Sequence, residues 1–247
     1  MKKKLKYISL VVIINIILLL LISCSGFSPL DLHKHSQIYN ICEISGSKTK
    51  IFLDSTVSEK IVEYEYCKYK ILIFKDSAEI LMFAGGMNSI SEIFWYTDEP
   101  YLYPVENIEI TEYKNVLGHN GIVISYLDGA DSRPIIYFTC ENDNISPLVI
   151  CNKSNYEIDI NGDKINDLIS CYNYRADIIY LYDNKLYIAE IGDILNKELN
   201  INGLMGYYNA ENNKFEFNEN QNTEKKVSIE CFIKNNILYY KLNQPEK

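Results

Sequence analysis

Residues 178–191 have the sequence IIYLYDNKLYIAEI, which contains two short strand-like runs around a two-residue turn. Isoleucine, leucine and tyrosine dominate on both sides of Asp183-Asn184. Such β-branched and aromatic residues favour pleated strands. Aspartate and asparagine tolerate the positive φ angles that a tight hairpin turn requires. We therefore expect an antiparallel hairpin at this point in the chain.

The same pattern recurs along most of the sequence, with a strand-like run about every 8–12 residues. The strongest further runs are residues 60–74, 92–97, 107–113, 122–127, 134–140, 167–174, 227–234 and 237–242. Asn235-Asn236 joins the last two into a second hairpin, and Asn120-Gly121 and Asp128-Gly129 are expected to form further turns.

These runs predict an all-β fold of about 12 to 16 short antiparallel strands, in an irregular propeller-like or sandwich architecture. No long-period repeat is apparent, so a regular propeller is not established. One short helix is expected over residues 192–199, with Asp193 as its cap. The polar residues 209–226 are expected to form a long hairpin loop or a decorated strand.

The N-terminus contains a lysine cluster at residues 2–6, an apolar run at residues 7–22, and the sequence LISC ending at Cys24. The apolar run is shorter than the roughly 20 residues of a membrane-spanning helix. The arrangement resembles a bacterial lipoprotein signal, in which a peptidase cuts before the cysteine. The resemblance implies a signal peptide over residues 1–23, and a thioether-linked diacylglycerol with an N-acyl chain, such as palmitate, on Cys24. The alternative is an uncleaved membrane anchor with a coincidental cysteine.

Both interpretations place the rest of the chain outside the cytoplasm. The lipoprotein interpretation predicts a lipid anchor on the extracytoplasmic face of the cell membrane, a tether over residues 24–36, and a β-rich domain over residues 37–247. Removing residues 1–23 removes four lysines from a formal net charge of −9 and leaves −13. This acidic balance argues against a nucleic-acid partner and favours metal cations. The membrane is the expected partner, and any protein or glycan partner stays unidentified.

Six cysteines remain besides Cys24, most of them inside strand-like runs. Disulfides are permitted outside the cytoplasm, whereas small buried thiols are the alternative. Their wide spacing, without any CxxC, indicates no zinc site. Cys140 and Cys151 flank the turn-like segment ENDNISP, so they are the expected disulfide pair.

An acidic loop, DINGDKIND at residues 159–167, is the most specific chemical motif in the chain. Alternating side chains in a tight loop can all point at one cation, and calcium takes six to eight oxygen ligands. The expected Ca²⁺ ligands are Asp159, Asn161, Asp163 and Asp167, together with the backbone carbonyl of Ile165. The alternative is an acidic turn that holds no metal.

Residues 159–168 resemble the calcium loop of integrin-type propeller blades, the FG-GAP or VCBS family, whose motif is D-x-N-x-D-G-x-x-D-L before a strand. The resemblance implies a structural calcium ion that ties neighbouring strands together. Lys164 stands where that motif has glycine, and a positive φ there would cost roughly 1 kcal/mol. The loop is not an EF-hand, since Lys164 and Ser170 replace the required glycine and glutamate.

No GxSxG, HExxH, P-loop or GxGxxG motif is present. The histidines at positions 33, 35 and 119 are expected in solvated segments, and the Glu63/Glu65 and Glu109/Glu112 pairs on solvent faces of strands. We therefore expect a surface lipoprotein without catalysis, whose calcium-stabilised β domain is a binding or scaffolding module. The alternative is an envelope hydrolase that acts on glycan with paired carboxylates. A third hypothesis is an immunity or sporulation factor. Genomic neighbours would distinguish it from the other two hypotheses.

Overall fold

A computed structural model describes residues 26–40, 60–63, 69–75, 78–86, 92–127, 133–141, 144–152, 154–172, 175–201, 203–219 and 228–243. The expected signal peptide, Cys24 and the Asp128-Gly129 turn lie outside these ranges. No helix within them is long and apolar enough to cross a lipid bilayer.

The described residues form 18 strands in four antiparallel sheets, so the all-β prediction is confirmed and the expected number of strands is exceeded. Sheet one contains β3 (Lys60–Glu63), β4 (Lys70–Lys75), β5 (Ile80–Gly86) and β6 (Glu92–Pro100). Sheet two contains β7 (Glu109–Val116), β8 (His119–Ser125), β9 (Pro134–Glu141) and β10 (Asn144–Asn152). A 3-10 turn, η1 (Val105–Asn107), lies between these two sheets in the sequence.

Sheets three and four each gain one strand from the N-terminal segment. Sheet three contains β11 (Ser154–Ile158), β12 (Asp167–Tyr172), β13 (Arg175–Tyr182), β14 (Lys185–Glu190) and β2 (Gln37–Ile38). Sheet four contains β15 (Leu204–Asn209), β16 (Lys214–Glu219), β17 (Ser228–Lys234), β18 (Ile237–Asn243) and β1 (Ser28–Asp31). The helices are α2 (Leu32–His35), between β1 and β2, and α3 (Ile191–Leu199), between β14 and β15.

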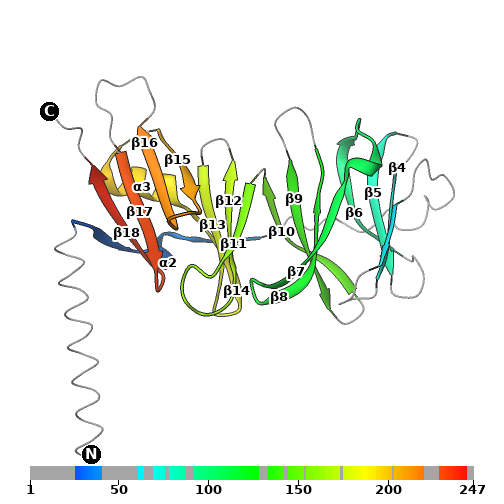
Figure 1. Ribbon diagram of the computed structural model, residues 1–247, viewed down its shortest axis with the longest axis horizontal. Coiled ribbons are helices and arrows are strands. Elements are labelled where there is room, and N and C mark those ends of the chain that lie inside the picture. The colour runs from blue at the N-terminus through cyan, green and yellow to red at the C-terminus, as the bar shows by residue number, and fades with distance from the viewer. Residues whose placement is uncertain are drawn as a thin grey trace, which may run out of the picture.

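The four sheets stand side by side in a row, with sheets one and four at opposite ends (Figure 1). Each sheet is built on a four-stranded meander, as a propeller blade is. Separate apolar clusters fill the spaces between sheets one and two, two and three, and three and four. The architecture is therefore blade-like, with three sheet-to-sheet interfaces along one row.

The two hairpins expected from their asparagine turns are confirmed. β13 and β14 pair up to Tyr182 and Lys185, and the turn residues Asp183 and Asn184 have φ angles of 48° and 57°. β17 and β18 likewise meet at Asn235-Asn236, with φ angles of 51° and 61°. Both turns thus adopt the left-handed conformation that matches the twist of a two-residue hairpin.

The turn expected at Asn120-Gly121 is wrong, because both residues lie inside β8. The β7–β8 turn is at Leu117 and Gly118 instead, with φ angles of 52° and 79°. Gly121 has a different role: a Cβ atom there would lie 1.9 Å from the backbone oxygen of Phe138 on the neighbouring strand β9. Glycine is needed at this position because two backbones approach closely.

The segment expected to be a tether over residues 24–36 belongs to the fold from Ser28 onward. β1 pairs with β18, and β2 pairs with β14. Leu32 is buried, and its backbone N–H donates to the carbonyl of Asn236 at 3.0 Å. His33, expected to be solvated, packs against the rings of Tyr182 and Tyr187 at centroid distances of 4.2 Å and 4.6 Å.

The expected Cys140–Cys151 disulfide is wrong, because the strand register holds the two cysteines far apart. Cys140 pairs with Ile145 in the β9–β10 register, whereas Cys151 pairs with Ile135 five residues away along β9. Five residues of strand span about 17 Å, and a disulfide needs Cα atoms within about 7 Å. The two cysteine side chains also pack in different cores, on opposite faces of sheet two.

The helix predicted at residues 192–199 is confirmed as α3, but Asp193 lies in its first turn and Glu190 is the N-cap residue. Asn200, in the left-handed conformation, ends the helix. The polar stretch at residues 209–226 contains strand β16, whose Phe215 and Phe217 are fully buried. The decorated-strand alternative is therefore the one observed for its described part.

Candidate metal centre

The acidic loop joins β11 to β12 in sheet three and lies beside the β7–β8 turn of sheet two (Figure 1). Gly162 and Lys164 have φ angles of 85° and 72°, so both residues adopt the left-handed conformation. Because β12 begins at Asp167, the last expected ligand is held by a strand, whereas Asp159, Asn161 and Asp163 lie on the loop itself.

The loop carboxylates and the amide side chain accept hydrogen bonds from the loop's own backbone. Asp159 Oδ1 accepts from the N–H of Gly162 at 2.7 Å, and its Oδ2 accepts from the N–H of Lys164 at 2.9 Å. Asn161 Oδ1 and Asp163 Oδ1 each accept from the N–H two residues ahead, at 2.9 Å and 2.8 Å. These bonds wrap the backbone around the acidic side chains. Each carboxylate oxygen has two lone pairs, so an amide bond leaves further acceptor capacity.

Asp167 is the most unusual residue of the loop because its side chain is fully buried. Its Oδ2 accepts from the N–H of Ile160 at 3.1 Å, but its Oδ1 is buried without a hydrogen-bond partner among the described residues. Burial raises the pKa of this carboxyl to about 7, and the nearby Asp163 and Asp159 charges add to the rise. A buried carboxylate oxygen without a partner is costly, and a bound cation is one of the groups that would compensate it.

The backbone of the loop is bonded to the β7–β8 turn. Asn166 donates its N–H to the carbonyl of Asn115 at 3.0 Å and accepts from the N–H of Leu117 at 2.8 Å. The Asn115 side-chain amide donates to the carbonyl of Lys164 at 2.6 Å. The loop therefore connects sheets two and three through three hydrogen bonds.

The β17–β18 turn of sheet four also lies near the loop. A Cβ atom built on Gly162 would lie 3.8 Å from the side-chain oxygen of Asn235. Since the loop belongs to sheet three and is bonded to sheet two, parts of three sheets meet around it.

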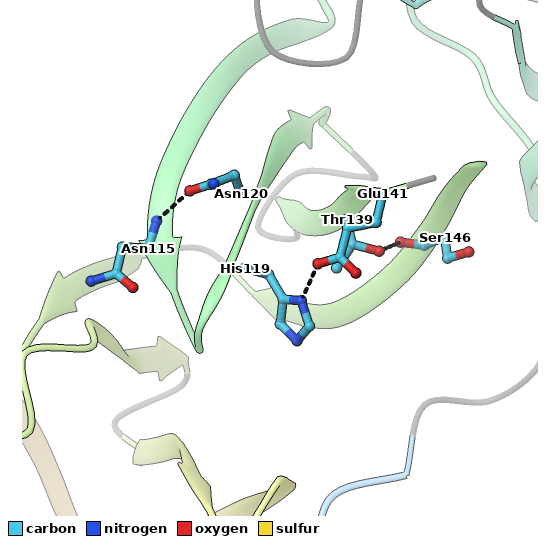
Figure 2. A network of polar contacts seen from close by, with 6 residues as sticks. All are labelled: Asn115, His119, Asn120, Thr139, Glu141 and Ser146. Atoms are coloured by element: carbon cyan, nitrogen blue, oxygen red, sulfur yellow. Dashed lines mark hydrogen bonds and ion pairs between the residues drawn. The ribbon is translucent and has the colours of Figure 1, made fainter. Parts of the chain in front are cut away.

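A polar network orders the β7–β8 turn to which the loop is bonded (Figure 2). The N–H of Asn115 donates to Asn120 Oδ1 at 2.9 Å, and His119 Nδ1 lies 2.7 Å from Glu141 Oε1 on β9. The His119 side chain is about one-third exposed, so it stays partly solvated beside Glu141. These contacts tie the turn to strands β8 and β9 of its own sheet.

The expected metal donors thus occur on one loop, but the side-chain oxygens of Asp159, Asn161 and Asp163 accept hydrogen bonds from the loop backbone. Within the described ranges, no group of three or more His, Cys, Asp or Glu side chains is close enough together to hold a metal ion. Asn161 Nδ2 donates to Asp163 Oδ2 at 3.0 Å, which keeps these two side chains paired with each other. A calcium ion would therefore require Asp159 and Asp163 to turn from the loop backbone toward Asp167, with Asn161 and the Ile165 carbonyl completing an oxygen-rich donor set.

Replacing Lys164 with glycine is expected to stabilise the protein by about 0.5–1 kcal/mol, because Lys164 holds a left-handed conformation with a φ of 72°. The substitution also removes a positive charge from the acidic loop, so calcium affinity should rise. Urea unfolding with and without Ca²⁺ measures both effects. Lys185→Gly, in the first position of β14 and therefore in extended backbone, is the control and should be destabilising.

No protein-family model matches the chain, and neither a curated protein nor a solved structure matches it. The likeness to propeller-blade calcium loops consequently rests on residues 159–168 and on the strands that flank them.

Proposed function

We propose that the protein is a lipoprotein anchored to the extracytoplasmic face of the cell membrane, with a calcium-stabilised β domain that acts as a binding or scaffolding module. The observation that carries the calcium part is the fully buried Asp167, whose Oδ1 has no hydrogen-bond partner among the described residues and which lies next to two further loop carboxylates. The lipobox-like sequence ending at Cys24 carries the anchoring part.

The proposed anchor would hold the domain close to the membrane. β1 begins at Ser28, four residues after Cys24, and four extended residues span at most about 14 Å. Two or three acyl chains on one cysteine suffice for stable attachment. A domain attached by such a short connection suits binding or scaffolding at the membrane surface.

Calcium would act on stability rather than on chemistry. The loop is hydrogen-bonded to sheet two, belongs to sheet three and approaches a turn of sheet four. A cation that neutralises its carboxylates would strengthen all three connections at once. Because it binds the folded state, such a cation adds about 2.7 kcal/mol of stability at a concentration one hundred times its Kd.

Adding Ca²⁺ to the domain (residues 25–247) is expected to raise its melting temperature by several degrees relative to EDTA, and Asp163→Ala should lose this gain. Differential scanning calorimetry measures both. Glu211→Ala, which removes the same charge from the exposed β15–β16 turn, is the matched control and should retain the gain. Equal melting temperatures in Ca²⁺ and EDTA for the unmodified domain would remove calcium from the proposal and leave only the lipid anchor.

The hydrolase alternative has one observation in its favour. Glu109 and Glu112 point to opposite faces of β7 and form no pair, but Glu109 and Glu157 line one cavity together with Tyr137. However, Glu109 accepts from Arg133 and Glu157 accepts from the hydroxyl of Tyr137, so both carboxylates already act as hydrogen-bond acceptors. A glycosidase requires one protonated carboxylic acid. Release of reducing ends from cell-wall glycan that Glu157→Gln abolishes would establish the alternative.

A further inference from the structure

A cavity of about 410 Å³ lies between sheet two and the edge strand β11 of sheet three, and none of the acidic loop's expected ligands lines it. This volume is within the range of small-molecule sites. Its floor is formed by alternate residues of β7, β8 and β9, and its wall by β11. Strand periodicity explains the floor, because residues two apart share one face of a sheet.

The floor of the cavity carries one positive charge, and this charge is already paired. The guanidinium of Arg133 donates to Glu109 and lies 3.4 Å from the hydroxyl of Ser125. Glu109 is the residue opposite Ser125 in the β7–β8 register, so the sheet itself brings these groups together. Arg133 and Glu109 therefore contribute no net charge to the cavity.

The wall of the cavity supplies a second carboxylate, Glu157, which accepts a hydrogen bond from the hydroxyl of Tyr137 at 2.8 Å. The side-chain amide of Asn155 donates to the same hydroxyl. Tyr137 is fully buried, and burial together with the Glu157 charge raises the pKa of its phenol, so it stays a neutral donor. Glu157, which is exposed, and Asn155 both line the cavity, and their side-chain oxygens have lone pairs that can accept further hydrogen bonds.

Among the described residues that line the cavity, no cation balances Glu157. The cavity is therefore acceptor-rich, with a net negative charge, inside a chain of formal net charge −9. An ammonium group offers three donors and one positive charge, which matches this set. The aliphatic side chains of Val123 and Ile135 also line the cavity and would contact a short carbon chain.

We infer that this cavity is a binding site for a small organic cation with a primary ammonium group on a short aliphatic chain. The ammonium binds Glu157 and Asn155, and the carbon chain packs against Val123 and Ile135. An anion would be repelled by the net charge, and a neutral sugar would lack the charge-assisted hydrogen bond that an ammonium makes with Glu157. The inference names a ligand class for the proposed binding module, but it depends on none of the residues of the calcium loop.

The test is a titration of the isotope-labelled domain with n-butylammonium, followed by NMR chemical shifts, with 1-butanol as the neutral probe of equal length. We expect saturable binding of butylammonium with shifts at β11 and β9, and at least tenfold weaker binding of 1-butanol. Glu157→Gln, which keeps the size of the side chain, should weaken butylammonium binding at least tenfold. Glu112→Gln removes the same charge from the other face of β7 and should leave binding unchanged.

Three outcomes would overturn the inference. They are no saturable binding of butylammonium, equally tight binding of 1-butanol, or an equal loss of butylammonium affinity in Glu157→Gln and Glu112→Gln. Saturable binding of N-acetylglucosamine instead would assign the cavity to a saccharide. Melting temperatures of both variants confirm that they fold. The titration and the melting temperatures are both measured in Ca²⁺ and in EDTA. Absence of butylammonium binding with intact stabilisation by Ca²⁺ would contradict only the ammonium site. Butylammonium binding without stabilisation by Ca²⁺ would contradict only the calcium proposal.

Discussion

Asp167→Asn is expected to raise the melting temperature of the protein in EDTA and, at the same time, to abolish stabilisation by Ca²⁺. The substitution removes a fully buried charge whose Oδ1 has no hydrogen-bond partner among the described residues. The asparagine oxygen can still accept from the N–H of Ile160, and its NH₂ group can donate toward Asp159 and Asp163. The same change removes the carboxylate that a cation would need most.

The size and the pH dependence of this effect follow from the pKa of Asp167. Burial raises it to about 7, against about 3.9 in an unfolded chain, and one pKa unit corresponds to about 1.4 kcal/mol. The folded protein therefore binds the proton more tightly, so in EDTA its stability falls as pH rises from about 4 to about 7. We expect Asp167→Asn to gain about 2–4 kcal/mol at pH 7.5 and to flatten most of this slope. Asp177, whose pKa burial raises to about 6, contributes a slope of the same sign in both proteins.

Asp183→Asn is the matched control, because it removes one aspartate charge from an exposed hairpin turn with a left-handed backbone that asparagine also adopts. Its melting temperature in EDTA should stay close to that of the unmodified protein, and its response to Ca²⁺ should be retained. Urea unfolding from pH 4.5 to pH 8 gives the comparison. A loss of stability for Asp167→Asn in EDTA would show that its carboxylate has a partner, and the case for a cation would fail.

Gly121→Ala is expected to destabilise the protein by about 3 kcal/mol, at or above the upper end of the usual cost of overpacking. The added Cβ atom would lie 1.9 Å from the backbone oxygen of Phe138, so strand β8 must move away from β9. Both strands contribute to the core between sheets one and two and to the cavity floor. Urea unfolding monitored by circular dichroism measures the loss.

Gly192→Ala provides the contrast for this prediction. Its Cβ atom would lie 3.3 Å from a ring carbon of Phe217, and the residue is in helix α3, where alanine is preferred by about 1 kcal/mol. This variant should remain within about 1 kcal/mol of the unmodified protein. If Gly121→Ala were equally mild, the close approach of β8 and β9 would not be a feature of the folded protein.

The local sequence was sufficient to predict those features whose conformation depends on a few neighbouring residues. Asp183-Asn184 and Asn235-Asn236 form the expected turns because asparagine and aspartate accept positive φ angles on their own account. The helix α3 and the placement of the acidic loop before strand β12 follow from short-range patterns as well. Lys164 has a positive φ of 72°, a conformation that the glycine of the resembled motif would adopt without strain.

Other predictions from the sequence failed because pairing between distant strands determined the conformation. Asn120-Gly121 has the composition of a turn, but it lies inside β8 because Gly121 must fit against the backbone of Phe138. Cys140 and Cys151 are eleven positions apart in sequence, yet the β9–β10 register places them at opposite ends of one hairpin. The segment that contains Leu32 is too short to be recognised alone, and only its pairing with β18 and β14 makes it part of the fold.

The sequence by itself determined the all-β class, the hairpin turns and the position of the carboxylates at Asp159, Asp163 and Asp167, because strand periodicity and turn propensity act over a few residues. Only the tertiary structure decided that four meanders stand in a row, that Asp167 alone among these carboxylates is fully buried, and that Glu157 faces Tyr137 across two sheets. Burial and charge pairing depend on which surfaces meet, and that is set by the packing of sheets whose residues lie far apart in the chain.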